Sequence, residues 1–169
     1  MDNFIFTNLP PEVLEAALAS DDDVGIYFRA HHLIEQAAEK AAEALYEKYG
    51  SLQHDSLHKH LNALEARGAQ GPVFRAARTV ANHRRPFAHT RTFLVTDAHV
   101  AQVRSQLEKP DVDAWAVPIK GQLVDFKKLR PAHQYLVLAL SIAGTIDIIG
   151  VRYRELFETT QPDSVSAAG

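Results

Sequence analysis

The residues best suited to chemistry gather between Arg75 and Phe93, where five arginines and two histidines stand among small and apolar residues. Arginine binds phosphate and carboxylate groups through paired hydrogen bonds, and it does so better than lysine. Within this stretch, Arg84 is followed by four residues and then by His89. Many proteins contain that spacing by chance, so the surrounding sequence decides its weight. The stretch suggests an anion-binding site, with Arg84 and His89 as the pair to follow.

The charge of the chain is uneven, although its net charge is only −3. Residues 1–66 hold 4 Lys/Arg against 12 Asp/Glu, a balance of −8. Residues 67–107 hold 7 arginines against Asp97 alone, a balance of +6, and residues 108–169 hold 7 against 8, a balance of −1. Two interpretations of the basic third stay open. Its arginines bind an anionic ligand, or they form a solvated face that pairs with the acidic N-terminal third, within the chain or across a dimer.

Length and composition fit one globular domain in a reducing compartment. The chain has 169 residues, of which 46% are hydrophobic, enough to build a core. The absence of cysteine excludes disulfides and thiolate metal sites and favours the cytoplasm. The N-terminus lacks the basic start and long apolar region of a signal peptide. The longest apolar run, Tyr135–Val151, is shorter than the roughly 20 residues that cross a bilayer, so we expect a buried core helix and no membrane contact.

The spacing of apolar residues predicts an all-α helical bundle of five to six helices. The expected helices span residues 12–19, 24–49, 57–66, 73–83, 98–108 and 133–157. The buried stripe of the first long helix is expected to contain Val24, Tyr27, Phe28, His31, Ile34, Ala38, Ala41, Leu45 and Tyr49. Pro86 lacks an N–H group and disfavours helical backbone at Arg85, so the helix that carries the arginines should end near residues 82–84 or kink there.

The C-terminal third is less regular until its last helix. Residues 110–129 form an irregular segment in which a small hairpin can form. In the last helix, Ala139, Ala143 and Gly144 would let another helix approach closely, either a neighbour in the bundle or the copy in a dimer. We expect a single domain over residues 1–158 and a flexible tail over residues 159–169.

The surroundings of Arg84 and His89 resemble a known family. The relevant segments are Asp22–Glu35 at the start of a long helix, Leu61–Gly68 before the arginine-rich helix, the run Phe87-Ala88-His89-Thr90 at its end, and then Phe93 and Asp97. Their order resembles the mannitol-operon repressor-like family, in which a helix ends in an Arg-Asn-x-Phe-Ala-His-Ser-type run. It is also similar to the wider HEPN superfamily, whose hallmark is an arginine, four to six residues and a histidine. The resemblance covers roughly residues 18–108.

The resemblance implies a HEPN-like homodimer. In catalytically active HEPN proteins the arginine and histidine act in metal-independent RNA cleavage, usually at a cleft between two protomers. At the matching positions, His89 would be general base or acid toward a ribose 2′-hydroxyl or the leaving oxygen, and Arg84 would stabilise charge on the phosphate. Arg78, Arg85 and Arg91 would hold the backbone of single-stranded RNA.

Two departures from the family pattern keep a second hypothesis open. Arg85 stands where asparagine or another small polar residue is typical, and its charge would lower the pKa of a nearby histidine. Pro86 changes the distance between Arg84 and His89. The chain is therefore expected to be either a non-catalytic regulatory or interaction protein, whose arginine-rich surface meets nucleic acid or an acidic protein, or an endoribonuclease of the toxin or defence type. Neither hypothesis requires a metal or a cofactor.

Other histidines are better explained by structure than by chemistry. His54, His58 and His60 lie close together in sequence, but no fourth ligand is evident, so we do not expect a metal site there. The neighbours His31 and His32 stand on the first long helix beside aromatic residues, and we expect hydrogen-bonded histidines in the core or at an interface.

Overall fold

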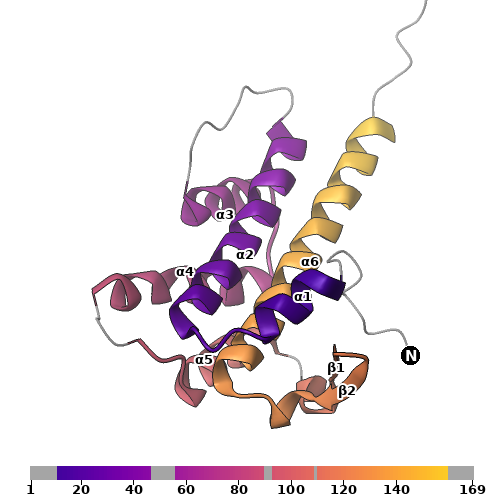
Figure 1. The fold of residues 1–169 in the computed structure, drawn as a ribbon. Helices are drawn as coiled ribbons and strands as arrows, with labels where there is room; N and C mark the ends of the chain where they lie inside the picture. The colour runs from indigo at the N-terminus through magenta and orange to yellow at the C-terminus, as the bar shows by residue number, and fades with distance from the viewer. Residues whose placement is uncertain (1–10, 47–55, 90–92, 109, 160–169) are drawn as a thin grey trace, which may run out of the picture.

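A computed structural model describes residues 11–46, 56–89, 93–108 and 110–159 of the chain. Within these ranges the protein is a helical bundle with one small antiparallel hairpin (Figure 1). Its elements are α1 (Pro11–Leu18), α2 (Asp23–Tyr46), α3 (Leu57–Ala66), α4 (Pro72–His89), α5 (Asp97–Leu107), β1 (Ala116–Ile119), β2 (Gln122–Asp125) and α6 (Pro131–Thr159), with 3-10 turns at Pro110–Ala114 and Phe126–Lys128. The predicted all-α bundle with an irregular segment is confirmed. The tail predicted from residue 159 onward lies almost wholly outside the described residues.

The two long helices, α2 and α6, form the centre of the bundle, and they lie side by side in Figure 1. Small residues make this packing close. A Cβ atom placed on Gly150 would come within 2.9 Å of the Cβ of Ala41, so the two backbones nearly touch there. Ala139 and Ala143 of α6 are also buried. Gly150, which was not among the small residues predicted for close approach, is thus the position where α6 comes closest to α2, and the prediction of a neighbouring helix or a dimer copy at Ala139, Ala143 and Gly144 stays open.

The hairpin confirms the irregular segment predicted over residues 110–129. Its strands pair from Ala116 opposite Asp125 to Ile119 opposite Gln122. Lys120 and Gly121, the two residues between them, both have positive φ angles, 50° and 74°. This left-handed pair is what a tight two-residue hairpin turn requires, and glycine adopts it at little cost.

The prediction for the buried stripe of α2 is correct in the middle of the helix and wrong at its start. Tyr27, His31 and Ile34 are buried, as expected. Val24 and Phe28 are instead 37% and 46% exposed. Ile26 and Ala30, which were not predicted, are fully buried in their place. The start of α2 is therefore rotated relative to the prediction, so that Ile26 and Ala30 lie inside the bundle and Val24 and Phe28 lie at its surface. Tyr49 lies outside the described residues.

The prediction that α4 ends near residues 82–84 is also wrong, because the helix continues through Pro86 to His89. Pro86 stands in the last turn, so it removes only one helical hydrogen bond, to the carbonyl group of the exposed residue Asn82. The turn is held by Phe87, which is 5% exposed and packs edge-on against Tyr27 with ring centroids 4.1 Å apart. Packing of this aromatic pair outweighs the local preference of the proline.

A buried carboxylate connects the starts of helices α2, α5 and α6. Asp23, the first residue of α2, is 7% exposed. Its Oδ2 accepts a hydrogen bond of 2.8 Å from the N–H of Val95, just before α5, and its Oδ1 forms an ion pair with Arg130, just before α6. Arg130 also donates a 2.7 Å hydrogen bond to the carbonyl oxygen of Ser20. One side chain thus fixes the starts of three helices relative to one another.

Helix α6 contains the one stretch in the described residues that is long and apolar enough to cross a membrane, judged by length and composition alone. It covers Pro131–Arg152, 22 residues with a mean hydropathy of 1.7, so its length does not exclude a membrane span. However, 67% of its apolar window is buried within the bundle, as in the core helix of a soluble protein. Burial, rather than length, supports the expectation of a core helix.

We predict that Asp23→Ala lowers the free energy of unfolding by about 2–3 kcal/mol, because it leaves the Val95 N–H and the Arg130 guanidinium without their acceptor. Urea unfolding followed by circular dichroism measures the change. Asp125→Ala is the control, since it removes a carboxylate of an exposed ion pair with Lys128 and should leave stability close to that of the wild type. Equal stability of the two variants would contradict the role of Asp23.

Candidate anion-binding site at the end of helix α4

Three arginines of the basic third form ion pairs with acids that the structure describes. Arg75 forms an ion pair with Glu108 of the α5 C-terminus. Arg78 donates hydrogen bonds to Glu65, at 3.2 Å from its Nε, and to Asn62, at 2.6 Å, and thereby joins α4 to α3. Arg104 forms two bonds of 2.8 Å with Asp113. The expected pairing with the acidic N-terminal third is therefore met by Arg78 alone, through Glu65, whereas Arg75 and Arg104 pair with acids of the C-terminal third.

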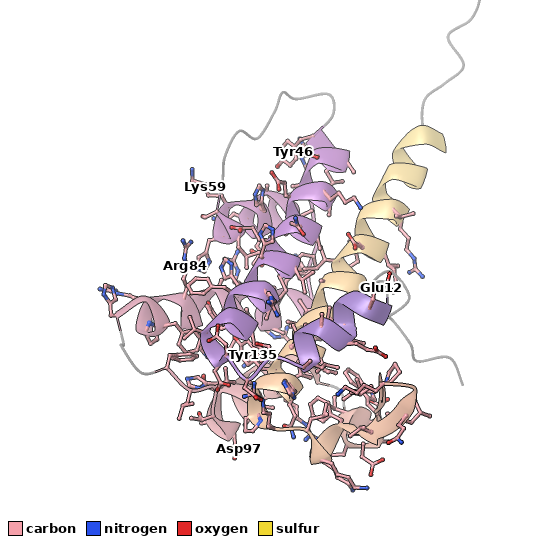
Figure 2. All side chains as sticks on the ribbon, in the orientation of Figure 1. Glu12, Tyr46, Lys59, Arg84, Asp97 and Tyr135 are labelled. Atoms are coloured by element: carbon pink, nitrogen blue, oxygen red, sulfur yellow. The ribbon has the colours of Figure 1, made fainter. Side chains whose placement is uncertain are left out.

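Arg84 and Arg85 differ from this pattern. Both are exposed, and neither side chain forms an ion pair with any residue that the structure describes. His89, at the end of the same helix, is exposed as well. In Figure 2, Arg84 lies at the outer surface, on the side of α2 away from α6. Arg91, the remaining residue of the predicted anion-binding set, lies outside the described residues. The end of α4 thus carries two cations that the described structure leaves for a ligand.

The continuous helix separates Arg84 from His89 in direction. Five residues along an α-helix amount to a turn of roughly 140° beyond a full rotation and a rise of about 7.5 Å. The two side chains therefore leave α4 on different sides. Within one chain the two side chains do not converge. A phosphate bound by Arg84 therefore contacts residues other than His89 of the same chain.

The residues that line a surface depression together with Arg84 belong to α2. A shallow depression of about 480 Å³ lies between α2 and α4, and it is lined by Phe28, Arg29, His31, His32, Glu35 and Arg84. Residues 28–35 form two turns of α2, and Arg84 faces them across the depression. Its volume falls in the range of small-ligand sites, and its lining combines an aromatic ring with two arginines and two histidines.

Glu35 organises the two histidines of this depression. Its Oε1 accepts a hydrogen bond of 3.1 Å from the N–H of Leu57, the first residue of α3. Its Oε2 lies 3.9 Å from Nδ1 of His32 and 4.0 Å from Nδ1 of His31. The side chain of His32 is 64% exposed, whereas His31 is buried. The prediction of a core or interface position is confirmed for His31 as a core residue, and for the exposed His32 an interface stays a prediction.

Burial lowers the pKa of His31, and the charge of Arg84 lowers it further, while Glu35 acts in the opposite direction. His31 is therefore neutral at pH 7, and a neutral imidazole can both donate and accept a hydrogen bond. The lining carries two positive charges from Arg29 and Arg84 against one negative charge from Glu35. The depression thus has a net positive charge and suits an anion.

Sequence reasoning missed Phe28, Arg29, His32 and Glu35 as members of a site. Phe28 was placed in the core because its position matches the helical stripe. No local pattern connects α2 with Arg84, about 50 residues later in the chain. One feature of the sequence could have indicated this site. Aromatic, arginine, histidine and glutamate residues are concentrated between Phe28 and Glu35.

The histidines near α3 do not form a comparable site. His60 is buried, and its Nδ1 has no hydrogen-bond partner among the described residues, whereas Nδ1 of His58 lies 3.5 Å from a guanidinium nitrogen of Arg78. Within the described ranges no three His, Asp or Glu side chains are placed to hold a metal ion. His54 lies outside those ranges.

We predict that Arg84→Ala raises the pKa of His31, because it removes a positive charge that disfavours the imidazolium ion. Glu35→Gln should lower the same pKa, since it removes a negative charge while its amide oxygen can still accept the bond from Leu57. Two-dimensional NMR of the histidine side chains as a function of pH measures both shifts. Arg75→Ala is the matched control on α4. If neither variant moved the pKa of His31, the three side chains would not share one depression.

Comparison with known proteins adds no relative: no family model, no curated protein and no solved structure matches this chain. The resemblance to the HEPN superfamily therefore remains an expectation from the sequence.

Proposed function

We propose that this protein is a HEPN-like regulatory or interaction module of the mannitol-operon repressor-like type, which binds an anionic partner at the end of α4. The observation that carries this proposal is the contrast among the arginines. Arg75, Arg78, Arg104 and Arg130 each pair with an acid, whereas Arg84 and Arg85 are exposed without an ion pair to any described residue. An exposed guanidinium that forms no ion pair with a described residue is available for a phosphate or carboxylate of a partner.

The depression beside Arg84 supports the same function. Arg29 adds a second cation from α2, and His32 adds exposed ring nitrogens. A partner that contacts Arg84 and Arg85 would therefore also contact polar side chains of α2. The proposal also includes a homodimer, which the family resemblance implies, and a cytoplasmic location, which the lack of cysteine favours.

We predict that the protein binds a labelled single-stranded RNA or polyglutamate in a salt-dependent manner, and that Arg84→Glu/Arg85→Glu weakens this binding about tenfold or more. Each phosphate contact that is lost should reduce the salt slope by about 0.7 for a single strand. Fluorescence anisotropy across a salt series measures both quantities.

The matched control for this experiment is Arg152→Glu, an exposed arginine on α6. It changes the net charge in the same sense at a distant place, so its effect is expected to be small. Absence of salt-dependent binding to either polyanion, or an equal loss per charge in the control, would contradict the proposed site.

A second candidate function, metal-independent endoribonuclease, is favoured by the exposure of His89 at the end of α4. A histidine sealed in the core could not reach a substrate, and this one is open to solvent. In that reaction the ribose 2′-oxygen would attack the phosphorus atom as His89 takes its proton. The 5′-oxygen would then leave and take up a proton from the His89 imidazolium or from water, giving a 2′,3′-cyclic phosphate and a 5′-hydroxyl. Because Arg84 and His89 point to different sides of α4, the two would have to come from different protomers of a dimer.

This second function predicts cleavage of RNA in the presence of a chelator, lost in both Arg84→Ala and His89→Ala and retained in Arg152→Ala. It also predicts complementation. In an equal mixture of the two inactive variants, about half of the dimers are mixed, and each mixed dimer holds one intact pair, so about a quarter of the activity should return. Intact RNA at high protein concentration would exclude the enzyme, and lack of complementation would exclude a site shared between protomers.

A further inference from the structure

Phe28 has an unusual position for a large apolar side chain. It is 46% exposed, and it lines the depression that Arg84 and Arg29 also line. Its ring lies edge-on to that of the fully buried Tyr27, with centroids 5.5 Å apart, so its inner side is supported by the core. Exposing an aromatic ring to water costs free energy, which a ligand that covers the ring would recover.

The neighbours of Phe28 indicate what kind of ligand would cover it. Arg29 follows it on α2, and Arg84 faces α2 from α4, so a cation stands on either side of the depression. Glu35 is the one acid in the lining, and its carboxylate is occupied by the N–H of Leu57 and faces His31 and His32. A flat apolar surface between positive charges fits a ligand that alternates planar rings with negative groups.

We propose that the depression takes one unpaired nucleotide of a single-stranded nucleic acid, with its base stacked on Phe28 and its flanking phosphates paired with Arg29 and Arg84. This inference rests on the proposed function and names the partner class of the same site. An acidic protein would satisfy the arginines and leave the ring of Phe28 without a planar partner. A duplex would satisfy the phosphates, but its bases are stacked on one another and cannot reach the ring. Single strands combine both features.

The test compares strands that carry the same charge and differ only in their bases. The probes are labelled oligonucleotides about 12 nucleotides long: an oligothymidylate, an oligouridylate, an abasic strand of the same length and a duplex. The wild type should bind the two strands with bases about 5- to 150-fold more tightly than the abasic strand, the range measured for one stacked base. Phe28→Ala should remove this difference and leave the affinity for the abasic strand unchanged.

Two variants serve as controls. Leu94→Ala removes an apolar side chain that is 70% exposed and does not line the depression, so it should keep the preference for bases. Arg84→Glu should weaken binding of strands with and without bases by the same factor, since it acts on the phosphate contact alone. Phe28→Leu keeps an apolar side chain without an aromatic face, and it should lose the base preference even where Phe28→Ala proves unstable.

The outcomes separate the two proposals. If no strand binds while polyglutamate does, the inference fails and the proposed function stands. If neither polyanion binds, both fail. If the wild type binds the abasic strand as tightly as the strand with bases, or if Phe28→Ala keeps the preference, the inference alone is overturned. The inference is also overturned if light scattering shows that Phe28→Ala turns a dimer into a monomer while the base preference is unchanged. The ring of Phe28 would then pack against a second copy of the chain.

Discussion

The buried carboxylate of Asp23 is the interaction on which the arrangement of this bundle depends. A charge in the interior is tolerated only with partners, and Asp23 takes them from two distant parts of the chain, the Val95 N–H and the Arg130 guanidinium. Because Asp23 is the first residue of α2, these contacts fix the rotation of that helix about its axis. The rotation places Ile26 and Ala30 against the core and turns Phe28 outward. Asp23 thus determines that Phe28 lies in the depression, although Asp23 itself does not line it.

Sequence periodicity predicted the helices well and the rotation of α2 poorly, for a physical reason. The spacing of apolar residues shows that a helix has a buried face, but a face that includes Val24 and Phe28 and one that includes Ile26 and Ala30 fit the start of α2 almost equally. The choice between them is made by α6 and by the partners of Asp23, which lie about 70 to 110 residues away in sequence. At Pro86, a correct local rule was overruled by the packing of Phe87 on Tyr27.

The site was only half visible in the sequence. The run of arginines around Arg84 marks an unusual concentration of one charge, and residue type alone indicates an anion. It does not tell a free arginine from a paired one. Arg78 and Arg84 looked alike in sequence, yet Glu65 and Asn62 engage the first, and no described acid engages the second. The α2 side of the depression arises from contact between helices, which no spacing within either helix can show.

The direction of side chains at the end of α4 separates two ways of using the same residues. Arg84 faces α2, so a ligand in the depression meets Arg84, Arg29 and Phe28 of one chain, and a single protomer is enough for binding. His89 leaves α4 on another side, so a reaction that needs both Arg84 and His89 needs a second protomer. Binding strength should then be insensitive to dimerisation, whereas cleavage should require it. The number of chains at the site, more than the identity of any one residue, distinguishes a binding module from a nuclease.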